Sequence, residues 1–192
     1  MKVGILAVQG AFFEHRKMLE SMGVECVELR KKSDLTGESL SGIVLPGGES
    51  TVQGKLLREL DMFDEVKRRI ESGLPVLATC AGLILLSAHI VNDSSIHLGT
   101  LPVAVRRNAY GRQLGSFVKK SSFSELGDFE MTFIRAPCVE KLENPEVQIL
   151  AKVDDKIVAV KYKNQLALAF HPELGKDTRI HGLFLQMIRE AA

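Results

Sequence analysis

The stretch PVLATCAGLILL, residues 75–86, is an apolar run whose centre is interrupted by Thr79, Cys80 and Gly82. Its first part, PVLAT, has the length and composition of a buried strand, and CAGLILLSAHI has those of a helix. We therefore expect a strand that ends at Thr79 and a helix over 80–90. Either the chain turns sharply at Cys80 and presents its thiol, or Cys80 is a small buried hydrophobic residue.

Strands and helices alternate along the rest of the first half. Apolar runs predict strands at 2–8 and 42–45, and alternating polarity predicts a half-buried strand at 24–29, near a sheet edge. Helical patterns predict a helix over 12–23 and one or two helices over 50–72. This order favours a parallel sheet that is covered by helices on both faces.

The second half, from about residue 97 to 170, consists of shorter, turn-rich segments. The segments that predict strands are LPVAV (101–105), LGSFV (114–118), MTFIRA (131–136), VQILAKV (147–153), KIVAVKY (156–162) and LALAF (166–170). The last two predict a hairpin, and a final helix is expected over 177–191 with Asp177 as its N-cap. We expect a single domain over residues 1–192: an open, mostly parallel α/β sheet flanked by helices, with an antiparallel extension.

Composition and charge exclude several classes of protein. Of the 192 residues, 45% are hydrophobic and 26% are charged, which is ordinary for a globular protein. A chain of this length buries roughly 70% of its unfolded surface. The net charge of +1 gives no reason to bind nucleic acid or anionic lipid. No apolar stretch approaches the length of a membrane span, and the N-terminal MKVGILAVQG predicts a first strand rather than a signal peptide.

The three cysteines, Cys26, Cys80 and Cys138, are widely spaced and form no C-x-x-C pair. Their spacing predicts neither a zinc site nor a disulfide framework. Because free thiols fit a reducing compartment, we expect a cytoplasmic protein.

The residues around Cys80 have the pattern of a nucleophile elbow. Small residues at positions 78 and 82 permit the tight strand-to-helix turn that lifts a nucleophile out of a sheet. At such a turn the helix N-terminus favours the thiolate, and the next backbone N–H can face a developing oxyanion. Cys26 and Cys138 lack this context, so we expect them to be inert.

A thiol nucleophile needs a base, since only a small fraction of an unperturbed thiol is ionised at neutral pH. His171 lies at the end of the predicted strand LALAF, with Glu173 two residues further on. Extended geometry places both side chains on one side of the chain, so Glu173 can accept from the imidazole and select its tautomer. Alternatively, the pair is a surface strand end with incidental charges. The other histidines are expected to be structural: His15 and His89 half-exposed in helices, and His97 and His181 without acidic neighbours.

LPGGES, residues 45–50, follows the buried strand at 42–45. Its glycines, Gly47 and Gly48, let backbone N–H groups approach a ligand closely. In an open α/β sheet this loop and Cys80 lie at the same carboxyl edge, where ligands bind. The loop either completes an oxyanion hole or holds the substrate, and a plain turn is the alternative.

These motifs, in this order and spacing, resemble a known family. TCAGL, LPGGEST and FHPE are similar to the motifs of the class I (triad-type) glutamine amidotransferases. Longer segments, from residue 3 to about 187, resemble the family of glutaminase subunits of pyridoxal 5′-phosphate synthase: GILAVQGAFFEH, LPGGEST, TCAGLILL, RRNAYGRQLGSF, FIRAP and FHPEL. The resemblance implies a flavodoxin-like fold.

The resemblance also implies roles for individual residues. Cys80 would be the nucleophile, His171 the general base and acid, and Glu173 the carboxylate that orients the imidazole. The N–H groups of Gly48 and Ala81 would bind the oxyanion. The residues implied to contact glutamine are Gly47, Gly48, Glu49, Arg107, Ile134 and Arg135.

The chain departs from the family pattern in two places. Ala78 stands where the general pattern has glycine, and SSIHL at 94–98 lacks a proline that often precedes this His-Leu-Gly. Both affect fine geometry rather than the triad. From the residues alone, Arg107 and Arg135 could also be solvated surface charges. No metal or organic cofactor is implied, because an activated thiol and an oxyanion hole suffice for amide cleavage.

The sequence thus predicts a glutaminase that hydrolyses L-glutamine to L-glutamate and ammonia through a Cys-His-Glu triad and a glutamyl thioester. The ammonia would pass to a synthase (lyase) subunit, the expected protein partner, which makes pyridoxal 5′-phosphate (vitamin B6). One rival is a cysteine peptidase or deglycase-like hydrolase on a similar sheet. Another is an inactive domain that only binds glutamine, against which the intact Cys80, His171 and Glu173 argue.

Overall fold

The computed structural model describes residues 1–111 and 115–191. The strands in this part of the chain are β1 (Lys2–Leu6), β2 (Glu25–Leu29), β3 (Gly42–Leu45), β4 (Val76–Thr79), β5 (Ser87–Ile90), β6 (Leu101–Arg106), β7 (Ser116–Phe123), β8 (Gly127–Ile134), β9 (Cys138–Leu142), β10 (Gln148–Val153), β11 (Lys156–Tyr162) and β12 (Gln165–Leu168). The α-helices are α1 (Phe12–Ser21), α2 (Lys32–Thr36), α3 (Ser50–Glu59), α4 (Phe63–Glu71), α5 (Ala81–Leu86) and α6 (Arg179–Glu190), and the 3₁₀ turns are η1 (Ser124–Leu126) and η2 (Pro172–Leu174). Within these described ranges, none of the helices is long and apolar enough to cross a membrane.

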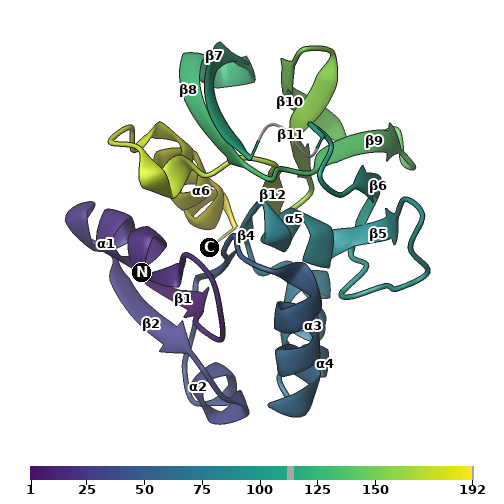
Figure 1. The fold of residues 1–192 in the computed structure, drawn as a ribbon. Coiled ribbons are helices and arrows are strands. Elements are labelled where there is room, and N and C mark those ends of the chain that lie inside the picture. Colours follow the sequence, from purple (N-terminus) through teal and green to yellow (C-terminus); the bar gives the residue numbers. More distant parts are fainter. Residues whose placement is uncertain (112–114, 192) are drawn as a thin grey trace.

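The strands form a mixed sheet in the order β2-β1-β3-β4-β12-β11-β10-β7-β8. From β2 to β12 every neighbouring pair is parallel. Helices α1 and α6 cover one face of this parallel part, and α3, α4 and α5 cover the other (Figure 1). Because both faces are covered, the central strands β1, β3 and β4 are built almost entirely of buried apolar residues.

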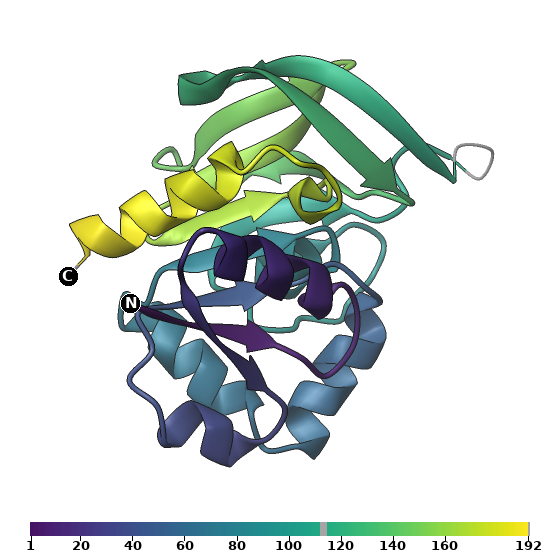
Figure 2. The same cartoon turned by 90° about the vertical axis from the view of Figure 1, so that its left-hand side faces the viewer.

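The sheet changes direction at β12. This strand pairs in parallel with β4 and antiparallel with β11, and the antiparallel extension continues through β10, β7 and β8. In Figure 2 the extension lies above the parallel part, with α6 crossing between them. A continuous cluster of buried side chains joins the two parts, from Val3 and Ile5 in β1 to Phe129 and Phe133 in β8. The predicted architecture, a mostly parallel α/β sheet with an antiparallel extension, is confirmed.

Local predictions are confirmed at both ends of the chain. β2 lies at the sheet edge and is only partly buried, as its alternating polarity predicts. The hairpin β11–β12 forms with Tyr162 opposite Gln165. A last helix forms as expected, but it begins at Arg179 with Thr178 as its N-cap, so the prediction of Asp177 as the N-cap is wrong. Asp177 lies one residue earlier, and its carboxylate accepts the backbone N–H of Arg179 at 3.0 Å.

The helix expected over 80–90 is shorter than predicted. It ends at Leu86, and Ser87–Ile90 form β5, which runs parallel to β6. Ser87 has a ψ of 140°, and its hydroxyl donates to the carbonyl of Ile84 at 2.9 Å, so the helix stops there. His89 is consequently not in a helix: it is exposed on β5, with Nδ1 2.8 Å from a carboxylate oxygen of Glu143. Composition alone does not separate a strand from a helix in so short an apolar run.

Other segments differ from prediction in their bounds. The range 50–72 forms α3 and α4, separated by a turn in which Asp61 has a φ of 53°. β8 begins before the predicted strand at 131–136, and β9 was not predicted. Residues 112–114 lie outside the described residues. They belong to the motif RRNAYGRQLGSF, and residue 114 is the first of the expected strand at 114–118.

Candidate active site

The loops that follow β1, β3, β4 and β12 meet at the carboxyl edge of the sheet. They bring Gln9, Gly48, Cys80 and His171 to the same cavity. Open α/β sheets bind ligands at this edge, because loops and helix N-termini converge there. Residues far apart in the sequence therefore form one site.

Cys80 lies on a strained turn between β4 and α5. Its φ of 47° and ψ of −99° are unusual for any residue other than glycine. The backbone N–H of Cys80 donates to the carbonyl of Leu168 at 2.8 Å, which ties the turn to β12. A Cβ on Gly82 would lie 2.1 Å from the carbonyl oxygen of Leu45, so the turn requires glycine at this position. The predicted sharp turn at Cys80 is thus present in the fold.

His171 and Glu173 form a buried pair beside this turn. Nδ1 of His171 is 2.7 Å from Oε1 of Glu173. The ring nitrogen that faces the carboxylate is a donor, so Nε2 is the atom left for proton transfer. Burial lowers the pKa of His171, but its hydrogen bonds with the Cys80 sulfur and with Glu173 outweigh burial and raise that pKa to about 10. The pair is therefore not an exposed strand end with incidental charges.

Glu173 remains ionised although it is 5% exposed. Burial raises its pKa, but the neighbouring His15 and His171 outweigh this and hold the pKa below its ordinary value. A carboxylate that stays charged in a buried place can stabilise an imidazolium. Glu173 thus has the protonation state that an orienting carboxylate requires.

The Gly47–Gly48 loop is held by hydrogen bonds from several directions. The N–H of Gly47 donates to Oγ1 of Thr79 at 2.9 Å, and the N–H of Glu49 donates to Oε1 of Gln9 at 2.9 Å. The N–H of Gly48 lies between these two donors. It makes no hydrogen bond to any of the described residues. A Cβ on Gly47 would lie 2.3 Å from Cε1 of His171, so only glycine lets the loop pass this close to the imidazole.

A cavity of about 330 Å³ lies over these groups. Its lining residues are Gln9, Gly48, Glu49, Ser50, Cys80, Ile84, Arg107, Asn108, Ile134, Arg135 and His171. The sequence-predicted residues that do not line it are Gly47, Ala81 and Glu173, which lie behind its surface. The structure therefore gathers the predicted nucleophile, base and substrate-contacting residues, with Gly47 and Glu173 as the second layer around His171.

Charged side chains of both signs surround the cavity. Nη1 of Arg107 is 3.1 Å from a carboxylate oxygen of Asp93, while its Nε and Nη2 are buried and lack a hydrogen-bond partner among the described residues. Arg135 adjoins Ile134, whose carbonyl accepts from the Cys80 thiol at 3.9 Å. Glu49 caps α3 by accepting the N–H of Val52 at 2.8 Å. The cavity thus offers guanidinium groups and a carboxylate to a small zwitterion.

Sequence reasoning missed the residues behind Glu173. His15 was expected to be half-exposed, but it is fully buried, with Nε2 3.3 Å from Oε2 of Glu173 and 3.1 Å from Oγ1 of Thr79. His181 was expected to be structural, without acidic neighbours; it is buried, and its Nε2 is 3.0 Å from Nδ1 of His15, a contact that was not predicted. Gln9 and Thr79 were missed as well. Only their position at or just after the end of a buried strand could have suggested that these two residues reach the site.

The other cysteines have a different environment from Cys80. All three thiols are free. Burial, followed by the nearby Glu20, raises the pKa of Cys26 to about 11, and burial also raises the pKa of Cys138. Neither lines the cavity. The prediction that they are chemically inert therefore has a physical basis.

The chain is similar to known proteins over nearly its whole length. A family model described as the SNO glutamine amidotransferase family matches residues 5–190. The pyridoxal 5′-phosphate synthase subunit PdxT of Desulfitobacterium hafniense (strain DSM 10664 / DCB-2) is 60% identical over 188 residues, which cover 98% of this chain and 94% of that protein. PdxT of Streptococcus pneumoniae (strain CGSP14) is 51% identical over 192 residues, covering 99% of this chain and 98% of that protein.

The fold is also that of a solved amidotransferase. A crystal structure described as a glutamine amidotransferase matches with a TM-score of 0.91 and 44% sequence identity, over 97% of this chain and 98% of that chain. The matches extend over nearly the whole sequence and include every segment that builds the cavity. The resemblance inferred from the motifs is confirmed, and the chain belongs to the SNO glutamine amidotransferase family.

Proposed function

We propose that this chain hydrolyses L-glutamine to L-glutamate and ammonia as the glutaminase subunit of a pyridoxal 5′-phosphate synthase. The observation that carries the proposal is the placement of the strained Cys80 and the buried His171–Glu173 pair at a single cavity. The relatives are named as subunits of pyridoxal 5′-phosphate synthase, and this indicates the pathway that uses the ammonia. We take residues 1–192 as a single amidotransferase domain that acts in the cytoplasm, in keeping with its free thiols.

Acylation begins with attack by the Cys80 thiolate on the side-chain carbonyl carbon of glutamine. The new C–S bond places negative charge on the carbonyl oxygen, which the N–H groups of Gly48 and Ala81 stabilise. Nε2–H of His171 gives its proton to the departing nitrogen, the C–N bond breaks, and ammonia leaves. A γ-glutamyl thioester on Cys80 remains.

Deacylation uses the same groups in reverse order. Neutral His171 removes a proton from water, and the hydroxide adds to the thioester carbon. Collapse of the tetrahedral intermediate breaks the C–S bond, releases glutamate and restores the Cys80 thiolate beside protonated His171. Glu173 holds the imidazole in one tautomer throughout, since its Oε1 accepts from Nδ1.

Substrate selection is assigned to the charged residues of the cavity. The α-carboxylate of glutamine pairs with the guanidinium groups of Arg107 and Arg135, and its α-ammonium faces Glu49. Ile134 and Gly48 fill the space along the aliphatic part of the substrate. A peptide bond has neither free terminal charge at this position, which disfavours the rival peptidase function.

The proposed partner is the synthase subunit that consumes the ammonia. Ammonia released into water would be protonated and lost to synthesis, so an uncoupled glutaminase is wasteful. The carbonyl of the Gly47–Gly48 peptide accepts the N–H of Ala11 at 2.9 Å, and docking of the partner would break this bond and turn the Gly48 N–H toward the oxyanion. Activity of the isolated chain should therefore be low.

Steady-state ammonia release with and without the synthase subunit tests the proposal. We expect at least a tenfold gain with the subunit, chiefly in kcat. A chloroketone analogue of glutamine should add a single mass equivalent, at Cys80. A chain that is neither labelled nor active in the complex is not a glutaminase, whereas equal kcat in both conditions would contradict only the coupling through the loop.

A further inference from the structure

A chain of buried polar side chains continues the triad beyond Glu173. Oε1 of Glu173 bonds His171, but Oε2 is buried and makes no conventional hydrogen bond among the described residues. The polar atom that faces Oε2 is Nε2 of His15, 3.3 Å away. Nδ1 of His15 lies 3.0 Å from Nε2 of His181. The proposed mechanism uses neither histidine.

The surroundings assign the protons of both imidazoles. If Nε2 of His15 carried a lone pair, that lone pair would face the charge of Glu173, so the proton belongs on Nε2. Nδ1 of His15 is then an acceptor, and His181 donates to it from its own Nε2. This leaves Nδ1 of His181 as a bare acceptor, which fits the absence of a partner for that atom among the described residues.

Both histidines remain neutral. Burial lowers the pKa of His15, and burial together with His15 lowers the pKa of His181 to about 3. A neutral imidazole with a fixed proton is a donor that does not change with pH in the physiological range. It can direct an N–H dipole at a carboxylate without neutralising it.

The same imidazole also contacts the threonine that anchors the loop with the proposed oxyanion donor. Nε2 of His15 is 3.1 Å from Oγ1 of Thr79, and that oxygen accepts the N–H of Gly47 at 2.9 Å. Thr79 immediately precedes Cys80. One side chain from α1 therefore contacts the carboxylate that orients the base and the threonine that anchors the Gly47–Gly48 loop.

We propose that His15, held in one tautomer by His181, is a positioning residue for the glutaminase reaction that fixes the second oxygen of Glu173 and, through Thr79, the Gly47–Gly48 loop. This inference rests on the proposed function. His15 touches neither substrate nor reacting atoms, so it affects the rate of the chemical steps and not the binding of glutamine. The segment GAFFEH thus places a functional side chain behind the site.

The test compares His15→Met with His15→Gln in the complex with the synthase subunit. Methionine fills similar volume without a donor, and glutamine keeps an amide N–H near the place of Nε2. We expect kcat to fall about 10- to 100-fold in His15→Met, as for loss of a polar contact to a charged group, with KM within about twofold. His15→Gln should recover most of kcat. His89→Met is the matched control, because His89 also pairs with a glutamate but lies exposed on β5.

A double-mutant cycle with Glu173→Ala shows whether His15 acts through Glu173. If it does, adding His15→Met to Glu173→Ala costs little further activity, because the oxygen that His15 positions is gone. Full additivity would overturn the action of His15 through Glu173, and wild-type kcat in His15→Met would overturn the whole proposal. If His15→Met fails to fold by circular dichroism, His15→Asn replaces it, since the asparagine amide is too short to contact Glu173. Equal kcat in His15→Asn and His15→Gln would then overturn it. If the wild-type complex released no ammonia, the proposed function itself would fail.

Discussion

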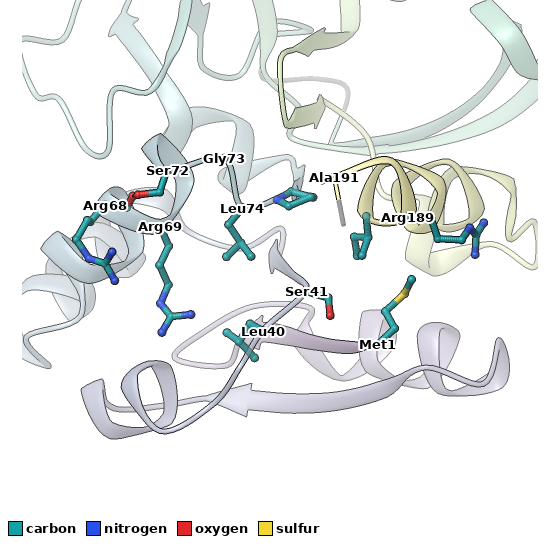
Figure 3. A pocket seen from close by; sticks show the side chains of 12 residues that line it. Met1, Leu40, Ser41, Arg68, Arg69, Ser72, Gly73, Leu74, Arg189 and Ala191 are labelled. Atoms are coloured by element: carbon teal, nitrogen blue, oxygen red, sulfur yellow. The ribbon is translucent and has the colours of Figure 1, made fainter.

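The two ends of the parallel strands carry cavities of very different character. At the amino ends, a cavity of about 790 Å³ lies among residues that precede β1, β3 and β4, including Met1, Leu40, Ser41, Leu74 and Pro75 (Figure 3). At the carboxyl ends, the cavity over Cys80 measures about 330 Å³. The larger one would be the first choice of a search by size.

The difference between the cavities lies in their chemistry. Two of the three arginines that line the larger cavity are already paired: Arg68 and Arg69 both bind Glu65, and Arg69 also donates to the carbonyl of Leu35. The third, Arg189, is exposed to solvent. The smaller cavity has a thiol and an imidazole on its surface, and Arg107 there has buried nitrogens that find no partner in the described part of the chain. Convergent groups that are not already satisfied by the protein therefore locate the site, whereas volume does not.

The largest expected effect that tests this contrast is the loss of activity in Cys80→Ala. Removing the nucleophile should reduce glutamine hydrolysis by a factor on the order of 10⁴ or more and abolish labelling by the chloroketone. Cys138→Ala, at a buried thiol whose pKa is raised, should keep both. Intact-mass measurement and ammonia release check the pair, and labelling that persists in Cys80→Ala would contradict the assignment.

Glu173→Gln should have the next largest effect. It keeps the side-chain volume but can present an N–H to Nδ1 of His171, which favours the wrong tautomer. The analogous change in serine enzymes costs about 10⁴ in kcat, and we expect less here because a thiolate needs less help from its base. Glu143→Gln, which alters the exposed carboxylate beside His89, is the control. Equal turnover in the two variants would remove Glu173 from the triad.

Arg107→Met should raise KM about 10- to 100-fold, with a smaller change in kcat. Two of the guanidinium nitrogens are buried and have no partner within residues 1–111 and 115–191, and a charge-assisted bond to the substrate carboxylate would satisfy them. The neighbouring Arg106 pairs with Glu140 on the surface, so Arg106→Met should leave KM unchanged. Initial rates against glutamine concentration measure both variants. A similar KM in both would mean that Arg107 does not bind glutamine.

The pH dependence of kcat/KM should show a decline only at high pH. The pKa of His171 is raised to about 10, so the imidazole keeps its proton through neutral pH and loses it as pH rises through that value. Since the leaving nitrogen needs this proton, kcat/KM should be level between about pH 7 and 9 and fall about tenfold per unit above pH 10. Glutamate formation measures the profile. In Glu173→Gln the decline should begin at lower pH, and an unmoved decline would show that Glu173 does not support the imidazolium.

The smallest effect is expected at the larger cavity. Arg189→Gln removes a charge from its edge and should leave kcat/KM within about twofold and stability within about 0.5 kcal/mol, as for most surface substitutions. Ammonia release and thermal unfolding check this. A tenfold loss of activity would mean that both ends of the strands serve the reaction, and the contrast between them would no longer hold.

Local patterns predicted the fold well, and they also predicted that Cys80, His171 and Glu173 lie together. The turn at Cys80 followed from small residues two positions before and after it, and His171–Glu173 followed from a spacing of two at a strand end. Boundaries were less predictable, since Ser87–Ile90 looked helical by composition but pair with β6. In that segment hydrogen bonding to a distant strand outweighed the local preference.

The sequence by itself determined the alternation of strands and helices, the strained elbow at Cys80 and the residue types of the proposed triad, because each depends on neighbours a few positions away. Only the tertiary structure decided what lies behind Glu173. His15 meets Thr79 and His181 across 64 and 166 positions, respectively. These contacts depend on how α1 and α6 pack on the same face of the sheet, and a histidine in an amphipathic pattern carries no local sign of its partner. Burial then makes the partner decisive, since a polar group shielded from water can be satisfied only by the atoms that packing brings to it.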